Sequence, residues 1–175
     1  IVLGMAACRR IAHADRFVRS GAWETGRFAP GRKFTGLRAG ILGLGRIGTE
    51  VAARLQGFKM TIGYYDPLPK AGVTYKAYTS PLELARNSDI LFLCAAGGPG
   101  VTGIASKEVI EALGPRGIFV NIARGWLHDE PALVAALKEG RLGAAGLDVF
   151  EHEPKVPTEL FALDNVVLTP HIASN

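Results

Sequence analysis

The chain has 175 residues, 48% of them hydrophobic and 21% charged, and its formal net charge is +4. This length supports one domain with a substantial core, and the composition is typical of a globular protein. The 20 basic residues are scattered among 16 acidic ones without a basic run, which argues against a nucleic-acid-binding surface. The apolar opening "IVLGMAAC" is too short to span a membrane, so we expect no membrane partner either.

Two cysteines, Cys8 and Cys94, lie far apart in apolar surroundings, with neither a metal-ligand nor a disulfide spacing. Free cysteines are typical of a reducing compartment, so we expect a cytoplasmic protein. The chain starts with Ile1 rather than Met, and we therefore expect it to be a piece of a longer protein.

The N-terminal part differs in pattern from the rest of the chain. Apolar residues recur at helical spacing through residues 1–19, which predicts one helix. The next stretch, 20–36, is rich in glycine and polar residues and contains a proline, so it predicts a connecting loop. A single domain core is expected over 37–175.

Strand and helix patterns alternate after residue 37. The helix over 80–88 has the strongest start signal, because Ser80 can cap it and Glu83 completes a capping box. The strand patterns are near-continuous apolar runs, as expected when helices cover both faces of a parallel sheet. We predict an α/β, Rossmann-type doubly wound sheet of about six strands, with strands over 39–45, 60–66, 89–95, 117–123, 144–150 and 165–170 and helices over 46–58, 80–88, 106–113 and 129–140.

The stretch "GLGRIG" (43–48) matches the pattern G-x-G-x-x-G between a predicted strand and a predicted helix. Gly43 would permit a tight turn, Gly45 would let a pyrophosphate approach the backbone, and Gly48 would let the helix pack closely. Arg46 and Ile47, within the turn, are expected to contact the same cofactor. The alternative is a glycine cluster that serves only helix packing.

Asp66 ends the second predicted strand, about 20 residues beyond the glycine turn. A carboxylate at this place accepts hydrogen bonds from the ribose hydroxyls of a dinucleotide. It would repel a 2′-phosphate, so the expected cofactor is NAD rather than NADP. The alternative is a turn residue, because Asp-Pro is a common turn start.

Four polar residues follow later strands: Arg124, Asp148, Glu153 and His171. The ligand crevice of an open α/β sheet lies at the carboxyl ends of its strands. Each residue alone could be an ordinary loop or cap residue, but together they suit the reduction of a 2-keto acid. A histidine can donate the proton, a neighbouring carboxylate can stabilise the imidazolium, and an arginine can bind the substrate carboxylate. The histidines show no metal-ligand spacing, so we expect no metal.

These residues resemble the D-isomer-specific 2-hydroxyacid dehydrogenases, a family that includes glyoxylate/hydroxypyruvate reductases and phosphoglycerate dehydrogenases. The resemblance implies that Arg124 binds substrate, that Glu153 and His171 form the catalytic acid–histidine pair, and that Asp148 contacts the nicotinamide carboxamide. It extends the expected cofactor contacts to Cys94, Thr102 and Ala123. The segments that carry it are "GLGRIGTEVAARLQGF" (43–58), "NIARG" (121–125), "DEPALVAALKEGRLGAAGLDVFEHEP" (129–154) and "NVVLTPHIAS" (165–174).

Family members are longer than this chain and carry a second, substrate-binding domain. The resemblance therefore implies that this chain is the NAD-binding domain, with residues 1–19 as an interdomain helix near a homodimer interface. A domain without its partner is expected to bind NAD without turnover. The alternative function is an NAD(H)-responsive binding module, as in the related transcriptional corepressors.

Overall fold

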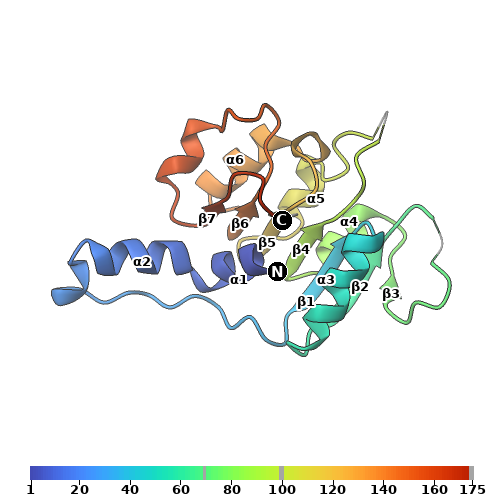
Figure 1. Ribbon diagram of the computed structural model, residues 1–175, viewed down its shortest axis with the longest axis horizontal. Coiled ribbons are helices and arrows are strands. Elements are labelled where there is room, and N and C mark those ends of the chain that lie inside the picture. Colours follow the sequence, from blue (N-terminus) through green and yellow to red (C-terminus); the bar gives the residue numbers. More distant parts are fainter. Residues whose placement is uncertain (69, 99–100, 174–175) are drawn as a thin grey trace.

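The computed structural model describes residues 1–68, 70–98 and 101–173 (Figure 1). Among these, strands form one parallel sheet in the order β3-β2-β1-β4-β5-β6-β7. The strands are β1 (Arg38–Leu42), β2 (Thr61–Tyr65), β3 (Lys76–Ala77), β4 (Ile90–Leu93), β5 (Ile118–Asn121), β6 (Ala144–Leu147) and β7 (Val166–Leu168). The predicted doubly wound fold is confirmed.

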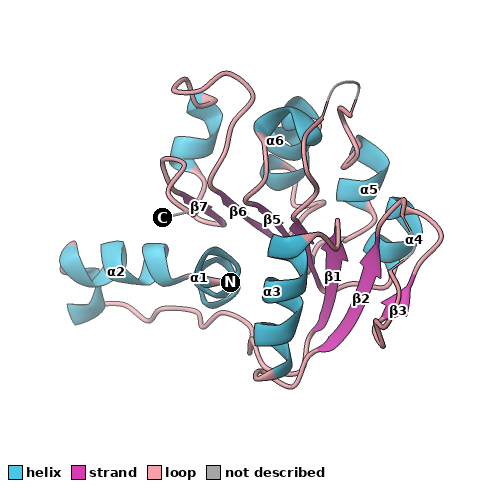
Figure 2. Cartoon of the chain, turned by 45° about the vertical axis from the view of Figure 1, so that its right-hand side comes forward, coloured by secondary structure: helices cyan, strands magenta, loops and turns pink. Residues whose placement is uncertain are grey.

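Helices cover both faces of the sheet (Figure 2). Successive strand residues point to opposite faces, so Phe92 joins one apolar cluster while its neighbours Leu91 and Leu93 join the other. One face carries α1 (Val2–Arg9) and α3 (Arg46–Gln56), and the other carries α4 (Pro81–Arg86), α5 (Lys107–Glu111) and α6 (Glu130–Lys138). This double burial explains why the strands read as unbroken apolar runs.

The predicted strand count of about six is corrected to seven within the described residues. The additional strand is β3, which pairs Lys76 with Gly63 and Ala77 with Tyr64 of β2. It has two exposed residues at the edge of the sheet, so it has no apolar run that a sequence pattern could reveal.

The single helix predicted over 1–19 is wrong, because the chain breaks at Arg10. Arg10 has a φ of 56°, in the left-handed region, and it separates α1 from α2 (Ile11–Arg19). Packing accounts for the break: α1 buries Leu3 and Ala7 against the sheet, whereas α2 has no buried residue and leaves the body of the molecule. Figure 1 shows α2 and the segment that returns from it as a projecting arm, which also contains the short helix η1 (Ala22–Glu24).

The start of α4 agrees with the sequence pattern. Ser80 Oγ accepts a hydrogen bond from the Glu83 N–H at 3.1 Å, while the Glu83 carboxylate accepts from the N–H of Thr79. Two further short helices, η2 (Gly125–Leu127) and η3 (Thr158–Ala162), follow β5 and precede β7. Within the described ranges, no helix combines the length and hydrophobicity needed to cross a membrane.

The strand order reverses between β1 and β4, because the chain runs from β1 outward to β3 and then returns to the other side of β1. Ligands of open α/β sheets bind at such a reversal, beyond the carboxyl ends of the strands. The glycine turn lies at this place, between β1 and α3.

Candidate functional site

Packing requires two of the three motif glycines and leaves the third exposed. Gly43 has a φ of 95°, and a Cβ there would lie 2.4 Å from the Cα of Ala95, which follows β4 across the reversal point. A Cβ on Gly48 would lie 2.1 Å from the Gly43 carbonyl oxygen, so α3 packs closely on the turn. A Cβ on Gly45 would meet nothing within 4 Å. Helix packing alone therefore does not explain Gly45, which leaves backbone accessible at the start of α3.

The helix start also lacks an internal cap. Gly45 is the N-cap of α3 and has no side chain to accept hydrogen bonds from the first turn. The unpaired N–H groups and the positive end of the helix dipole favour an anion here. Arg46, the exposed first residue of α3, adds positive charge at the same point.

Asp66 follows β2 and binds the glycine turn directly. Its Oδ2 accepts a hydrogen bond from the Leu44 N–H at 2.9 Å, and its Oδ1 accepts from the Leu68 N–H at 3.0 Å. Lys70 Nζ forms an ion pair with Oδ1 at 3.1 Å. The carboxylate is thus fixed between the second strand and the turn, beside the place that an adenosine ribose occupies in folds of this kind.

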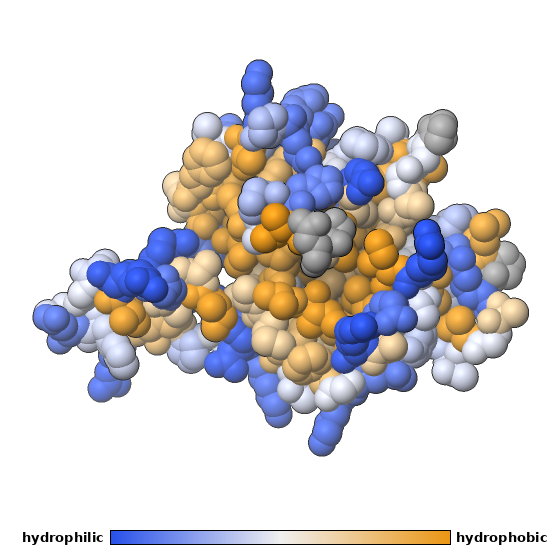
Figure 3. Space-filling model, viewed as in Figure 1, coloured by the Kyte–Doolittle hydropathy of each residue, from blue (hydrophilic) through white to orange (hydrophobic). Residues whose placement is uncertain are grey.

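Two adjoining hollows lie along the carboxyl ends of the strands. The first, here called the turn hollow, is lined by Gly45, Arg46, Ile47, Cys94, Ala95, Ala96, Gly97, Ile122, Ala123 and Arg124. The second, the apolar hollow, shares Arg46, Ile47 and Ile122 with it and extends to Asp148, Thr169, Ile172 and Ala173. Figure 3 shows apolar side chains gathered in the middle of this face. Most of the residues predicted to bind a cofactor therefore line one continuous depression.

Cys94 and Thr102, two of the residues predicted to bind the cofactor, differ in their position relative to the hollows. Burial raises the pKa of the Cys94 thiol to about 12, so this side chain is a neutral wall of the turn hollow and not a reactive thiolate. Thr102 is exposed and lines neither hollow. The structure thus brings Cys94 to the other predicted residues but not Thr102.

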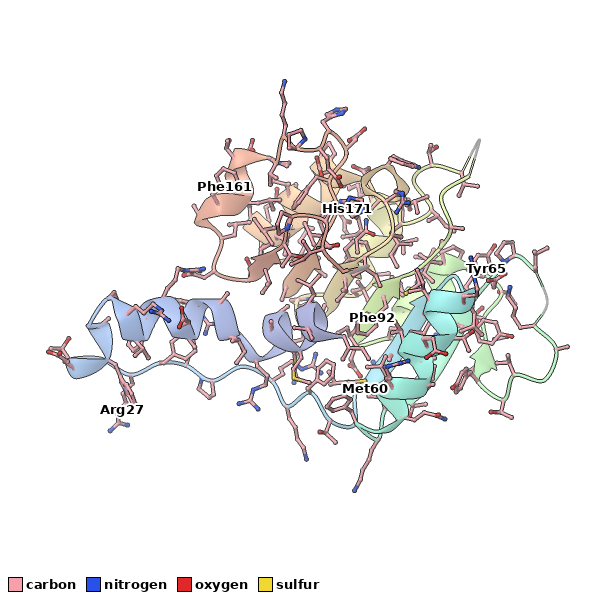
Figure 4. The ribbon with its side chains drawn as sticks, in the orientation of Figure 1. Arg27, Met60, Tyr65, Phe92, Phe161 and His171 are labelled. Atoms are coloured by element: carbon pink, nitrogen blue, oxygen red, sulfur yellow. The ribbon has the colours of Figure 1, made fainter. Side chains whose placement is uncertain are left out.

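His171 and Glu153 are in direct contact. His171 Nδ1 lies 2.8 Å from Glu153 Oε2, and Glu153 Oε1 accepts a hydrogen bond from the Phe150 N–H at 3.0 Å. The hydrogen bond from His171 is the main reason that the pKa of Glu153 lies below its usual range. Both side chains are partly exposed, and Figure 4 shows His171 far from Arg27 at the tip of the arm.

Asp148 supports the turn that carries His171. Its side chain is almost completely buried, and it accepts hydrogen bonds from Thr169 Oγ1, from the Ile172 N–H at 3.0 Å and from the Ala173 N–H at 2.9 Å. Its carbonyl oxygen also accepts from the His171 N–H at 2.9 Å. His171 has a φ of 54°, in the left-handed region that few non-glycine residues adopt, and these bonds on both sides hold it there.

Arg124 lies in an exposed position after β5, and its Nη1 donates to the carbonyl oxygen of Ala123 at 2.6 Å. Two buried polar residues near it, Asn121 and His128, were not singled out from the sequence. The only signal for Asn121 was a polar residue at the end of an apolar run, "IFVN". The contact between it and His128 depends on the path of the intervening loop.

A parallel doubly wound sheet, a glycine turn at the strand reversal and an acid after the second strand define a dinucleotide-binding domain. The chain belongs to the D-isomer specific 2-hydroxyacid dehydrogenase family, whose NAD binding domain matches residues 1–173.

Similar proteins agree with this family. The chain is 53% identical over 174 residues to hydroxyphenylpyruvate reductase of Plectranthus scutellarioides and 49% identical to glyoxylate/hydroxypyruvate reductase A of Arabidopsis thaliana, covering 99% of this chain and 56% of each relative. The solved NADPH-dependent glyoxylate/hydroxypyruvate reductase of Sinorhizobium meliloti, in complex with NADP and malonate, superposes with a TM-score of 0.93 at 37% identity, covering 98% of this chain and 55% of that one. The chain thus spans about half the length of its curated relatives.

Proposed function

We propose that this chain is the cofactor-binding half of an oxidoreductase that transfers hydride between NAD(H) and a small 2-keto or D-2-hydroxy acid, such as glyoxylate or hydroxypyruvate. The observation that carries the proposal is the His171–Glu153 contact at the same sheet edge as the glycine turn. The reductase names of the most similar relatives favour catalysis over a purely regulatory binding module.

His171 is the proposed proton donor. Because its Nδ1 faces Glu153, Nε2 is the ring nitrogen that remains for the substrate carbonyl oxygen. Glu153 fixes the ring orientation and stabilises the imidazolium, as carboxylate partners of catalytic histidines do. In the oxidation direction, neutral His171 takes the hydroxyl proton of the 2-hydroxy acid through the same nitrogen.

Arg124 is the proposed ligand of the substrate carboxylate. It lines the turn hollow, and its guanidinium offers a planar set of donors that match a carboxylate. Its present hydrogen bond is to the neighbouring carbonyl of Ala123, which a negatively charged ligand can displace.

The residues of the turn hollow, together with Asp66 beside the glycine turn, fit a dinucleotide. The open surface over Gly45, the uncapped start of α3 and Arg46 suit a pyrophosphate, and Asp66 suits the ribose hydroxyls. When bound, the nicotinamide supplies or accepts the hydride. We propose NAD over NADP because the Asp66 carboxylate would repel a 2′-phosphate, even though the similar Sinorhizobium meliloti enzyme is NADPH-dependent.

Steady-state reduction of glyoxylate and hydroxypyruvate by the complete protein, with NADH and NADPH in parallel, tests this function. We expect turnover with NADH and a fall in kcat of roughly 10²–10⁴-fold in His171→Ala. His152→Ala, an exposed histidine in the same loop as Glu153, is the matched control and should retain full activity. Undiminished turnover by His171→Ala with every acid tried would refute the assignment, and NADH-dependent association without turnover would favour the binding-module alternative.

We also propose that residues 1–175 form one cofactor domain, with 1–19 as the interdomain segment, 20–36 as the connecting loop and 37–175 as the core, and that the substrate domain lies elsewhere in the complete protein.

The projecting arm supports a homodimer contact, since α2 has no buried residue and Val18 and Trp23 are exposed. Sedimentation of the complete protein and of Trp23→Ser tests the dimer. Free cysteines support a cytoplasmic location.

A further inference from the structure

Asn121 closes the loop that carries Arg124. It is the last residue of β5, its side chain is fully buried, and it makes three hydrogen bonds. Its Nδ2 donates to the Arg124 carbonyl oxygen at 2.9 Å, and its Oδ1 accepts from the Ala123 N–H at 2.9 Å. Nδ2 also lies 2.9 Å from His128 Nδ1. One amide therefore holds both ends of the Ala123–Arg124 segment.

The partners determine where every proton lies. A backbone N–H can only donate and a backbone carbonyl can only accept, so the bonds to Ala123 and Arg124 fix which side of the Asn121 amide carries oxygen. The amide nitrogen is a donor, so His128 Nδ1 must accept from it, and the ring proton lies on Nε2. The neutral ring of His128 is thus a required acceptor in this network.

His128 Nε2 gives a second, independent sign that the network has a purpose other than stability. It is the buried side-chain polar atom without a hydrogen-bond partner among the described residues. An unpaired buried donor destabilises the folded chain, a cost that an apolar side chain of similar size would avoid. The ring packs on Phe119, at 5.7 Å between ring centroids, so the site would accept an aromatic residue.

We propose that Asn121 and His128 are positioning residues for the substrate carboxylate, acting through the backbone of Arg124. This inference rests on the proposed function. Asn121 holds the Ala123 N–H on one side and the Arg124 carbonyl oxygen on the other, so it fixes the backbone from which the Arg124 side chain extends along the turn hollow. His128 keeps the Asn121 amide from rotating, since rotation would lose all three bonds.

The test uses Asn121→Asp, which keeps the size of the side chain and the acceptor for Ala123 but removes both donors. We expect its KM for the 2-keto acid to rise about 10-fold or more while its KM for NADH changes by less than about 2-fold, because the lost bonds act on Arg124 and not on the glycine turn. His128→Phe should also raise the KM for the 2-keto acid, by a smaller factor.

Asn165→Asp is the matched control. Asn165 also donates through its side-chain amide to two backbone carbonyls, those of Leu137 and Gly143, but at a distance from Arg124 in the fold. A purely structural role for Asn121 would make its variant behave like Asn165→Asp, with a lower Tm and both KM values unchanged. That result, in an active wild-type protein, would overturn the inference.

Failure of the proposed function has a different signature, which is the absence of turnover in the wild-type protein itself. Amide hydrogen exchange then still tests whether Asn121 holds the Ala123–Arg124 segment. Exchange over residues 123–127 should be faster in Asn121→Asp than in wild type and unchanged in Asn165→Asp. Equal exchange in both variants would overturn the inference irrespective of turnover.

Discussion

The neighbouring strands β5 and β6 end in the same way but support their turns differently. Each leads to a buried polar residue, Asn121 with 0% and Asp148 with 1% relative exposure, whose side chain holds the turn that carries an exposed residue proposed for catalysis. Asn121 holds Arg124 through bonds that stay within seven residues of itself, whereas Asp148 holds the His171 turn through partners 21 to 25 residues away. The arginine is thus supported locally and the histidine by a tertiary contact.

The two supports also differ in charge. The bonds to the Asn121 amide join neutral groups, while those to the Asp148 carboxylate are of the charge-assisted kind, which is roughly twice as strong. The supports are joined, since the Asp148 N–H donates to the Asn121 carbonyl oxygen at 3.0 Å. We therefore expect losses at Asp148 to be larger than losses at Asn121 and to extend to the C-terminal segment.

The largest effect is expected for Asp148→Ala. The change leaves two backbone N–H groups and the Thr169 hydroxyl without their acceptor, which should cost about 3–5 kcal/mol in free energy of unfolding and lower kcat by disordering the His171 turn. Urea denaturation of the chain measures the free energy of unfolding, and steady-state kinetics of the complete protein measure kcat. Asp164→Ala, an exposed acid with two arm contacts, is the control and should lose less than about 1 kcal/mol. Similar losses of stability in both variants would mean that Asp148 does not support the His171 turn.

Gly125→Ala is expected to disturb both turns together. A Cβ on Gly125 would lie 2.0 Å from the backbone carbonyl of Phe150, so the loop after Arg124 touches the loop that leads to Glu153. Backbone cannot give way cheaply, and we expect a loss of about 3 kcal/mol in stability together with a rise in KM and a fall in kcat. Gly98→Ala, where a Cβ meets nothing within 4 Å, should leave the Tm unchanged. A stable, fully active Gly125→Ala would show that the two turns are independent.

The Asn121 support should fail at acid pH, because it needs the neutral ring of His128 as a hydrogen-bond acceptor. Burial lowers the pKa of His128 to about 4, against the opposing effect of Asp129, while an unfolded histidine titrates near 6.5. The unfolded chain therefore binds this proton between pH 6.5 and 4 and the folded chain does not, so stability falls with falling pH, by up to about 1.4 kcal/mol per unit. Urea denaturation across this range should show the slope in wild type and a reduced slope in His128→Phe. An unchanged slope in that variant would place the responsible proton elsewhere.

Local patterns were sufficient to predict the sheet apart from its edge strand β3, and to predict the sheet edge at which the candidate site lies. Apolar runs identified the strands, and the glycine turn with Asp66 located the strand reversal, because both depend on residues close in sequence. Arg124, Glu153 and His171 were found as polar residues beyond strand ends. Two of them, Glu153 and His171, prove to be in contact.

What the sequence did not reveal depends on contacts between distant segments. The break at Arg10 follows from α1 packing on the sheet while α2 leaves it, and neither fact is visible in the shared helical spacing of residues 1–19. The predicted contact of Asp148 with nicotinamide stays a prediction, and the sequence did not reveal that its carboxylate accepts hydrogen bonds from three groups of the segment around His171. Such partners become visible only once β6 and β7 are paired.

The smallest stability effect is expected for Glu153→Gln. This variant separates the supporting residues, which contribute to stability, from the proposed catalytic pair, which contributes to turnover. The Glu153–His171 pair is partly exposed, with side-chain exposures of 36% and 41%, so its loss should cost less than about 1 kcal/mol. Contact with His171 lowers the pKa of Glu153, so this contribution is present above the unfolded value near 4.3 and disappears as the pH falls below it. Wild type and Glu153→Gln should therefore converge in urea denaturation at acid pH. At neutral pH the variant should nevertheless lose most of its kcat, because the imidazolium of His171 loses its counter-charge. A variant that unfolds as readily as Asp148→Ala would instead make this pair part of the scaffold.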